Sequence, residues 1–319
     1  MAETHCRRSV SRGDDACTDP SSHPVRLAFE AFLDYQRATG YSRKTTLDYE
    51  RITGRFIDFL CGQCNDLDEV KPHHITTYLA NLQERGLSPW TVNSHYRRMH
   101  AFWNWCLKQE LVEHDPFLKL RAPRLPELHK PAPSPDEVKR LLDGCTGKHW
   151  QRLRDRAILL VCLDTGLRLS ELLAMRVADG KRDRFVVTGK GRKERMVFLS
   201  AQTRYAISKY LSHCPYRLND DDQLWWGERG RMTFEGMRMV FRHLSERTGV
   251  KVTSHTLRRT FATDLIRDET PLEAVRQLLG HSSLQAIAHY LRLTETDLQR
   301  MHERHSPVKR ILARKETLR

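Results

Sequence analysis

The sequence has no apolar run of the ~18 residues that a membrane-spanning helix needs. Its opening residues also contain no apolar segment of the kind found in signal peptides. Its eight cysteines are scattered without the spacing of a disulfide framework, so free thiols are expected. These absences predict a cytoplasmic protein and argue against membrane-spanning and disulfide-rich secreted classes.

Acidic side chains are also scarce, 40 against 54 lysines and arginines, which gives a net charge of +14. That excess favours a nucleic-acid partner over an anionic membrane surface.

Motifs for metals and nucleotides are missing as well. There is no HExxH motif and no acidic triad, and GKGRKER at 189–195 lacks the GxxxxGK[ST] spacing of a P-loop. The sequence therefore predicts no cofactor. One group of possible zinc ligands remains as an alternative: Cys61 and Cys64, followed by His73 and His74. Adjacent histidines lack the spacing typical of zinc ligands, so a turn between helices is the favoured interpretation.

Patterns in the first half of the chain predict an all-α domain. Residues 1–23 are polar and aperiodic, which predicts a disordered tail. Four amphipathic helices are expected within 24–118, the second and fourth opening at the capping residues Ser42 and Ser88. Residues 119–133 contain four prolines and four basic side chains, which predicts an extended basic linker.

The second domain is expected to span residues 134–306, with a basic tail at 307–319. Ser134 and Glu137 form a capping box, and an apolar helix follows near 150–163. Two short strands, starting near residues 185 and 196, flank a glycine-bearing turn and predict a β-hairpin. The expected fold class is therefore mostly α with one small antiparallel hairpin. Further helices are expected near 202–212, 233–247, 255–268, 271–279 and 294–304.

The segment SHTLRRTF, residues 254–261, raises an electrostatic question. Ser254 is the predicted N-cap, yet the first turn carries His255, Arg258 and Arg259. Cations at the positive end of a helix dipole usually destabilise the helix. At about 100° per residue, His255 and Arg258 lie on one edge of the apolar stripe, and Arg259 lies on the far side. Either an anion binds between the first two, or the turn is an ordinary solvated basic face.

Three other segments contribute reactive side chains to the second domain. Taken alone, each has an ordinary explanation: a lysine in a solvated turn, a histidine capping a helix, or a tyrosine in a core. The four segments supply Arg168 (TGLR), Lys190 (GKG), His255 and Arg258 (HxxR), and His281 followed nine residues later by Tyr290 (LLGH…Y). In this order and spacing the motifs resemble the tyrosine recombinase family, the phage integrases and Xer-like enzymes, over roughly residues 24–306.

The resemblance implies a role for each of these residues. Arg168 and Arg258 would bind the scissile phosphate, and Tyr290 would be the nucleophile. His255 and His281 would be the active-site histidines, and Lys190 would protonate the leaving group. Guanidinium groups suit this chemistry, because they bind phosphate oxygens in pairs and stay protonated. The sequence departs from the family at a short interval between Arg168 and Lys190, and at Gln285-Ala286-Ile287, where the family often has threonine.

The resemblance also implies an architecture and an activity. Residues 24–118 would form a four-helix, SAM-like core-binding domain and 134–306 a catalytic domain, together clamping double-stranded DNA. The expected activity is that of a site-specific recombinase (integrase), which cleaves and rejoins DNA through a 3′-phosphotyrosine without metal or ATP. Four protomers, identical or of two kinds, would act on nucleoid DNA. The alternatives are a type IB topoisomerase-like enzyme and a catalytically silent DNA-binding protein.

Overall fold

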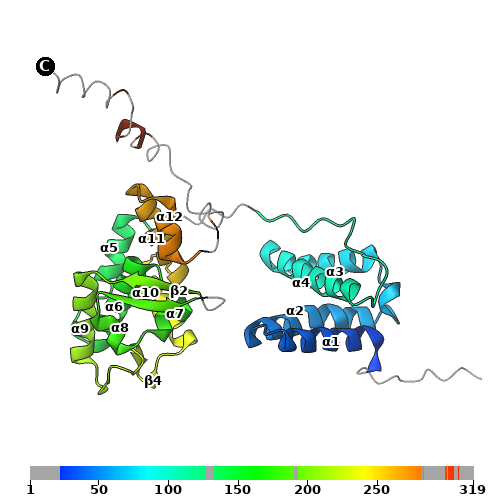
Figure 1. Cartoon of the computed structure of the whole chain (residues 1–319), viewed down its shortest axis with the longest axis horizontal. Helices are drawn as coiled ribbons and strands as arrows, with labels where there is room; N and C mark the ends of the chain where they lie inside the picture. The colour runs from blue at the N-terminus through cyan, green and yellow to red at the C-terminus, as the bar shows by residue number, and fades with distance from the viewer. Residues whose placement is uncertain are drawn as a thin grey trace, which may run out of the picture. The chain divides into compact units, whose positions relative to one another are not determined.

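The structure is a computed structural model that describes residues 22–126, 132–189 and 193–281, together with 283, 299, 301–304 and 308. The chain divides into two compact units, residues 1–129 and 130–319 (Figure 1). Because the described residues begin at 22, most of the predicted tail at 1–23 lies outside them. None of the described helices combines the length and apolar character needed to cross a bilayer.

The described part of the first unit is helical, as predicted. Serine caps open two of its helices: the Ser42 hydroxyl accepts from the Thr45 N–H at 3.1 Å, and the Ser88 hydroxyl accepts from the Thr91 N–H at 3.2 Å. Residues 121–126, within the predicted linker, form neither helix nor strand. The elements are α1 (Pro24–Ala38), α2 (Arg43–Cys61), the 3₁₀ turn η2 (Leu67–Glu69), α3 (Pro72–Glu84) and α4 (Pro89–Lys108).

Aromatic side chains dominate the core of this unit. Phe56, Phe102 and Trp103 are fully buried, and the Phe29 ring packs edge-on against Phe102 with centroids 5.5 Å apart. Such burial stabilises the bundle mainly through the apolar area removed from water.

The CGQC segment forms a turn between helices, as predicted. Cys61 ends α2, and the Cys64 sulfur lies 3.6 Å from Nδ1 of His74. Within the described ranges no three His, Cys, Asp or Glu side chains are grouped so that they could hold a metal ion. The zinc interpretation therefore gains no support from the geometry.

The second unit is built around a buried helix, α6, as its apolar sequence predicts. Ala157, Ile158 and Leu159 have no exposed surface, and α9 and α11 pack against the same helix. The elements are α5 (Pro135–Asp143), α6 (Trp150–Thr165), α7 (Leu169–Ala174), α8 (Val177–Lys181), β1 (Arg184–Thr188), β2 (Glu194–Phe198), α9 (Ala201–His213), β3 (Trp226–Gly227), β4 (Gly230–Arg231), α10 (Phe234–Thr248), α11 (Ser254–Arg267) and α12 (Leu272–Leu279).

The predicted hairpin is present. Strands β1 and β2 pair antiparallel, with Val186 opposite Met196. The Gly189 N–H donates to the carbonyl of Lys193 at 2.8 Å and extends the pairing past the last strand residues. A second antiparallel pair, β3 with β4, and the short helix α8 were not predicted, because segments of two to five residues carry too little periodicity.

The predicted cap of the SHTLRRTF helix is wrong by one residue. Thr253 is the N-cap of α11, and its hydroxyl accepts a hydrogen bond from the Thr256 N–H at 3.1 Å. The Thr256 hydroxyl in turn accepts from the Thr253 N–H at 2.6 Å, which completes a capping box. This reciprocal pair satisfies two terminal donors, so Ser254 becomes the first helical residue.

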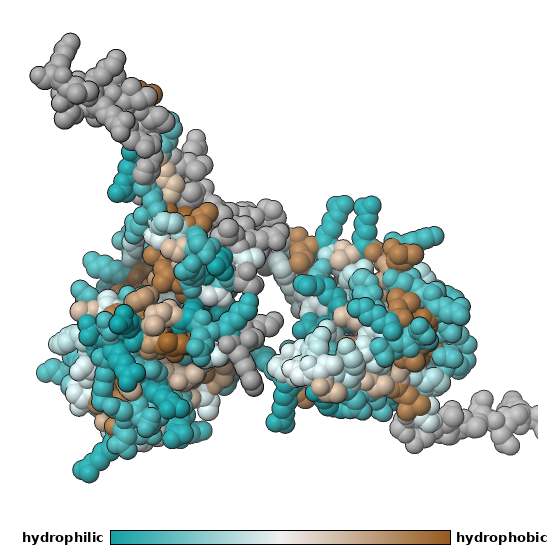
Figure 2. All heavy atoms as spheres, viewed as in Figure 1, coloured by the Kyte–Doolittle hydropathy of each residue, from teal (hydrophilic) through white to brown (hydrophobic). Residues whose placement is uncertain are grey.

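Figure 2 shows that hydrophilic side chains cover much of the visible face of both units, with apolar patches between them.

Candidate active site

The TGLR turn sets the position of Arg168. Helix α6 ends at Thr165 and is capped by Gly166, whose φ of 60° lies in the left-handed region that glycine adopts without strain. A Cβ on this residue would lie 2.5 Å from Cδ1 of Phe261, so a larger side chain would force the Phe261 ring to move. Arg168 is then the N-cap of α7, and its Nη1 donates to Oε1 of Glu171 at 2.8 Å. The turn therefore places one guanidinium beside a carboxylate.

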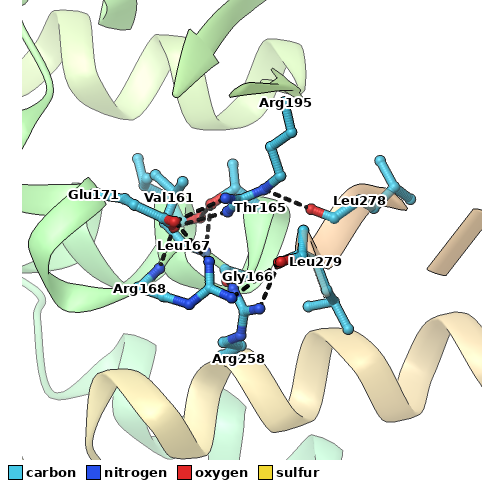
Figure 3. A network of polar contacts seen from close by, with 11 residues as sticks. Val161, Thr165, Gly166, Leu167, Arg168, Glu171, Arg195, Arg258, Leu278 and Leu279 are labelled. Carbon is cyan, nitrogen blue, oxygen red and sulfur yellow. Dashed lines mark hydrogen bonds and ion pairs between the residues drawn. The ribbon is translucent and has the colours of Figure 1, made fainter. Parts of the chain in front are cut away.

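The LLGH turn at the end of α12 approaches the TGLR turn. Arg258, only 3 % exposed, donates from Nη1 to the carbonyl of Gly166 and from Nη2 to the carbonyl of Leu279, both at 2.5 Å. Arg168 donates from Nη2 to the next carbonyl, that of Gly280, at 3.2 Å. Two predicted arginines from distant segments thus meet at one helix end (Figure 3).

The hairpin supplies a third arginine. Arg195 on β2 donates from Nη1 and Nη2 to the two carboxylate oxygens of Glu171, each at 2.8 Å, and from Nε to the carbonyl of Leu278 at 3.0 Å. Directly after β1, a Cβ on Gly189 would lie 3.5 Å from Oε1 of Glu171 and 3.7 Å from Nη1 of Arg168. The turn that follows β1 therefore begins beside the same carboxylate. Arg168, Arg195, Arg258 and Glu171 are called the arginine cluster below.

Glu171 and Arg195 were not predicted from the sequence, although each leaves a signal. Glu171 stands three residues after Arg168, the spacing of a capping box. Arg195 alternates along β2 with exposed residues and shares the inward face with the buried Val197, an unusual place for a charge. Burial raises the pKa of Glu171, but hydrogen bonds from Arg195 and Arg168 outweigh that effect and lower the pKa to about 2.

His281 and His255 lie near the arginine cluster. The pKa of His281 is lowered to about 4, first by burial and then by the nearby positive charges of Arg258, Arg168, Arg195 and His255. His255 itself is exposed in the first turn of α11. The predicted pair of histidines therefore belongs to the same electrostatic environment as the arginines.

We expect His281 of the free protein to remain neutral down to about pH 4. Its folded-state pKa lies below the unfolded value of about 6.5, so its contribution to stability is present above pH 6.5 and is lost as the pH falls toward 4. An NMR titration of the imidazole, assigned with His281→Gln, measures this directly. A midpoint near 6.5 would contradict the proposed influence of the cluster.

The remaining two predicted residues, Lys190 and Tyr290, lie outside the described residues. The structure thus brings together Arg168, Arg258 and His281, with His255 nearby, and the placement of the other two stays a prediction.

Comparison with known proteins identifies the family. Residues 134–297, just over half of the chain, match the family described as the phage integrase family. The chain belongs to this family. Residues 28–113 match the phage integrase N-terminal SAM-like domain, which accords with the helical first unit. The mostly helical fold class with small antiparallel sheets is confirmed.

Two curated relatives and one solved structure resemble the chain over nearly their whole length. Tyrosine recombinase XerD of Brucella suis is 30 % identical over 304 residues, covering 88 % of this chain and 97 % of the relative. Tyrosine recombinase XerD of Oceanobacillus iheyensis is 28 % identical, covering 89 % and 99 %. The solved Tn1549 transposon integrase, in complex with a circular intermediate DNA, shares the fold with a TM-score of 0.70 and 20 % identity, covering 89 % and 99 %.

The enzyme is a tyrosine-type site-specific DNA recombinase, as the sequence motifs predicted. The comparisons do not favour the two alternatives, a type IB topoisomerase-like enzyme and a silent DNA-binding protein.

Proposed function

We propose that Arg168 and Arg258 of the arginine cluster bind the scissile phosphate of a recombination site. The observation that supports this is the convergence of Arg168 and Arg258 on the carbonyls of Gly280 and Leu279, directly before His281. In-line attack on a phosphodiester concentrates negative charge on the non-bridging oxygens, and fixed guanidinium groups stabilise that charge. The anion inferred from the SHTLRRTF helix would then be this phosphate.

In the proposed reaction the Tyr290 oxygen attacks phosphorus, and the bond to the 5′ oxygen breaks. The phenol of a tyrosine has an ordinary pKa of ~10. Its deprotonation therefore requires both nearby positive charges and a histidine that accepts the proton. His255 and His281 are the candidates for that proton transfer or for hydrogen bonds to the phosphate. Lys190 gives its proton to the departing 5′ oxygen. A 3′-phosphotyrosine remains, which conserves the bond energy for rejoining without ATP.

We propose the same division of labour between the domains that the family resemblance implies. Residues 24–118 would be the core-binding domain and residues 134–306 the catalytic domain, joined by the basic linker at 119–133. The net charge of +14 supports binding to double-stranded DNA, and the similar Tn1549 integrase was solved in complex with DNA. Four protomers acting on nucleoid DNA in the cytoplasm are the proposed assembly.

A two-site assay tests the proposed function. DNA trapped covalently on the protein in its host is sequenced to find the site, and two copies are placed on one plasmid. We expect excision or inversion between the copies, because strand exchange joins ends from different sites. Relaxation of a plasmid without any exchange would instead support the topoisomerase-like alternative.

Cleavage is expected to proceed at an unchanged rate in excess EDTA. The physical reason is that Arg168, Arg258 and Lys190 would supply the positive charge that metal ions supply to many other phosphoryl transferases. The measurement is single-turnover cleavage with and without chelator, with a Mg²⁺-dependent nuclease as the positive control for chelation. Activity that disappears with EDTA and returns with Mg²⁺ would contradict the mechanism.

A further inference from the structure

The end of α12 and the two residues after it accept hydrogen bonds from arginine side chains. The helix ends at the left-handed cap Gly280, with φ 62°, and the last carbonyls of a helix have no partner within it. The carbonyls of four successive residues each accept from an arginine side chain, and the negative end of the helix dipole strengthens such bonds. The pairs are Arg195 with Leu278, Arg258 with Leu279, Arg168 with Gly280, and Arg276 with His281.

The proposed mechanism uses neither Arg195 nor Arg276. Arg195 bonds to Glu171 of the arginine cluster, whereas Arg276 bonds to Glu273 on its own helix. The side chain of Arg195 is only 8 % exposed, and all three guanidinium nitrogens donate to protein oxygens, those of Glu171 and Leu278. Arg168, by contrast, is 35 % exposed. The side chain of Arg195 is thus committed to the protein, whereas that of Arg168 is open to a ligand.

The charge balance shows what Arg195 contributes. The carboxylate of Glu171 is 3 % exposed and bonds to both Arg168 and Arg195. Without Arg195, the buried carboxylate of Glu171 would be paired with Arg168 alone. It would then cancel the positive charge of Arg168, which the phosphate needs for binding. With Arg195 present, the three groups retain one net positive charge, and Arg168 is the member that reaches solvent.

Close packing supports a positional role as well. A Cβ on Gly280 would lie 2.8 Å from Cδ of Arg195, so the stem of this arginine lies directly against the LLGH turn. Arg195 therefore ties the strand that follows the Lys190 turn to the turn that carries His281 (Figure 3).

We propose that Arg195 is a positioning residue for strand cleavage: it neutralises Glu171 and fixes the hairpin to the end of α12, so that Arg168 keeps its charge and orientation for the phosphate. This inference rests on the proposed function. Arg195 touches no reacting atom in this account and acts through Arg168 and the LLGH turn.

The first test is Arg195→Lys, which keeps the charge but cannot pair with both oxygens of Glu171 and the Leu278 carbonyl together. We expect single-turnover cleavage of the trapped site to fall by about 10²-fold, because small displacements at a reacting centre have effects of this size. The dissociation constant for DNA should change by no more than about threefold, since positioning affects chemistry rather than binding.

A matched control separates positioning from stability. Arg154 is also buried, with a side chain 7 % exposed, and bonds to Asp155 and to the Trp226 carbonyl at 2.9 Å. Arg154→Lys should therefore lower the melting temperature about as much as Arg195→Lys but leave the cleavage rate of the folded enzyme near wild type. Equal losses of cleavage in both variants would overturn the proposal.

A double substitution tests the charge argument. Arg195→Met leaves Glu171 to cancel Arg168, so cleavage should be lost more completely than in Arg195→Lys. Adding Glu171→Gln removes the uncompensated charge and should raise the cleavage rate of Arg195→Met by about tenfold or more, a coupling that a double-mutant cycle measures. A double variant no faster than Arg195→Met overturns the inference while leaving the proposed function intact. If wild-type protein forms no adduct with DNA, the proposed function fails, and this inference fails with it.

Discussion

Tyr290→Phe is expected to abolish the covalent protein–DNA adduct while leaving DNA binding unchanged. The substitution removes one hydroxyl, the proposed nucleophile, and keeps the aromatic ring. An oxygen that replaced it would have to be aligned with the phosphorus and activated by the surrounding positive charges. The measurement pairs a denaturing gel, which detects the adduct on labelled DNA, with a gel-shift titration of binding.

Tyr205→Phe provides the control for this experiment. Tyr205 is an exposed tyrosine on α9, 69 % accessible, and no motif of the active site includes it. Its substitution should leave both adduct and binding at wild-type levels. An adduct that persists in Tyr290→Phe would remove Tyr290 from its proposed role.

Arg258→Lys is expected to reduce the cleavage rate by about 10²–10³-fold, the range found when one stabilising donor is removed from an oxyanion site. Lysine keeps the charge but lacks the planar pair of Nη atoms with which Arg258 bonds to the carbonyls of Gly166 and Leu279. The TGLR and LLGH turns would lose the guanidinium that bonds to both of them from α11, and the phosphate would lose a planar donor.

The neighbouring arginine supplies the control for this prediction. Arg259 lies one residue later on α11, so the helical rotation of about 100° turns its side chain to a different direction. Arg259→Lys should cleave at a rate close to wild type, whereas Arg258→Lys should not. Equal rates in the two variants, measured by single-turnover cleavage at saturating protein, would contradict the account of Arg258.

Local sequence signals predicted most of the fold. The capping serines at positions 42, 88 and 134 open helices as expected, because a cap depends only on residues within one turn. The cap of α11 was misassigned to Ser254 because Thr253, directly before it, is also a suitable capping residue. The reciprocal hydrogen bonds between Thr253 and Thr256, which the structure shows, decide between the two. The pair β3 and β4 was missed, because two-residue strands depend on tertiary packing.

The candidate site was predictable only in part. Arg168 and Arg258 stood in recognisable motifs, and the structure brings them to one helix end. Glu171 and Arg195 were missed, because their importance comes from a contact between residues 24 positions apart that no local pattern encodes. The carbonyls at the end of α12 are invisible to sequence analysis, since every residue type carries a backbone carbonyl.

The most direct test of the central claim is to map the covalent bond. DNA carrying the trapped site is incubated with the protein, the adduct is digested with protease and nuclease, and the modified peptide is sequenced by mass spectrometry. We predict a nucleotide joined through its 3′ phosphate to the oxygen of Tyr290. A nucleotide joined to another residue, or joined through its 5′ phosphate, would contradict the proposed mechanism.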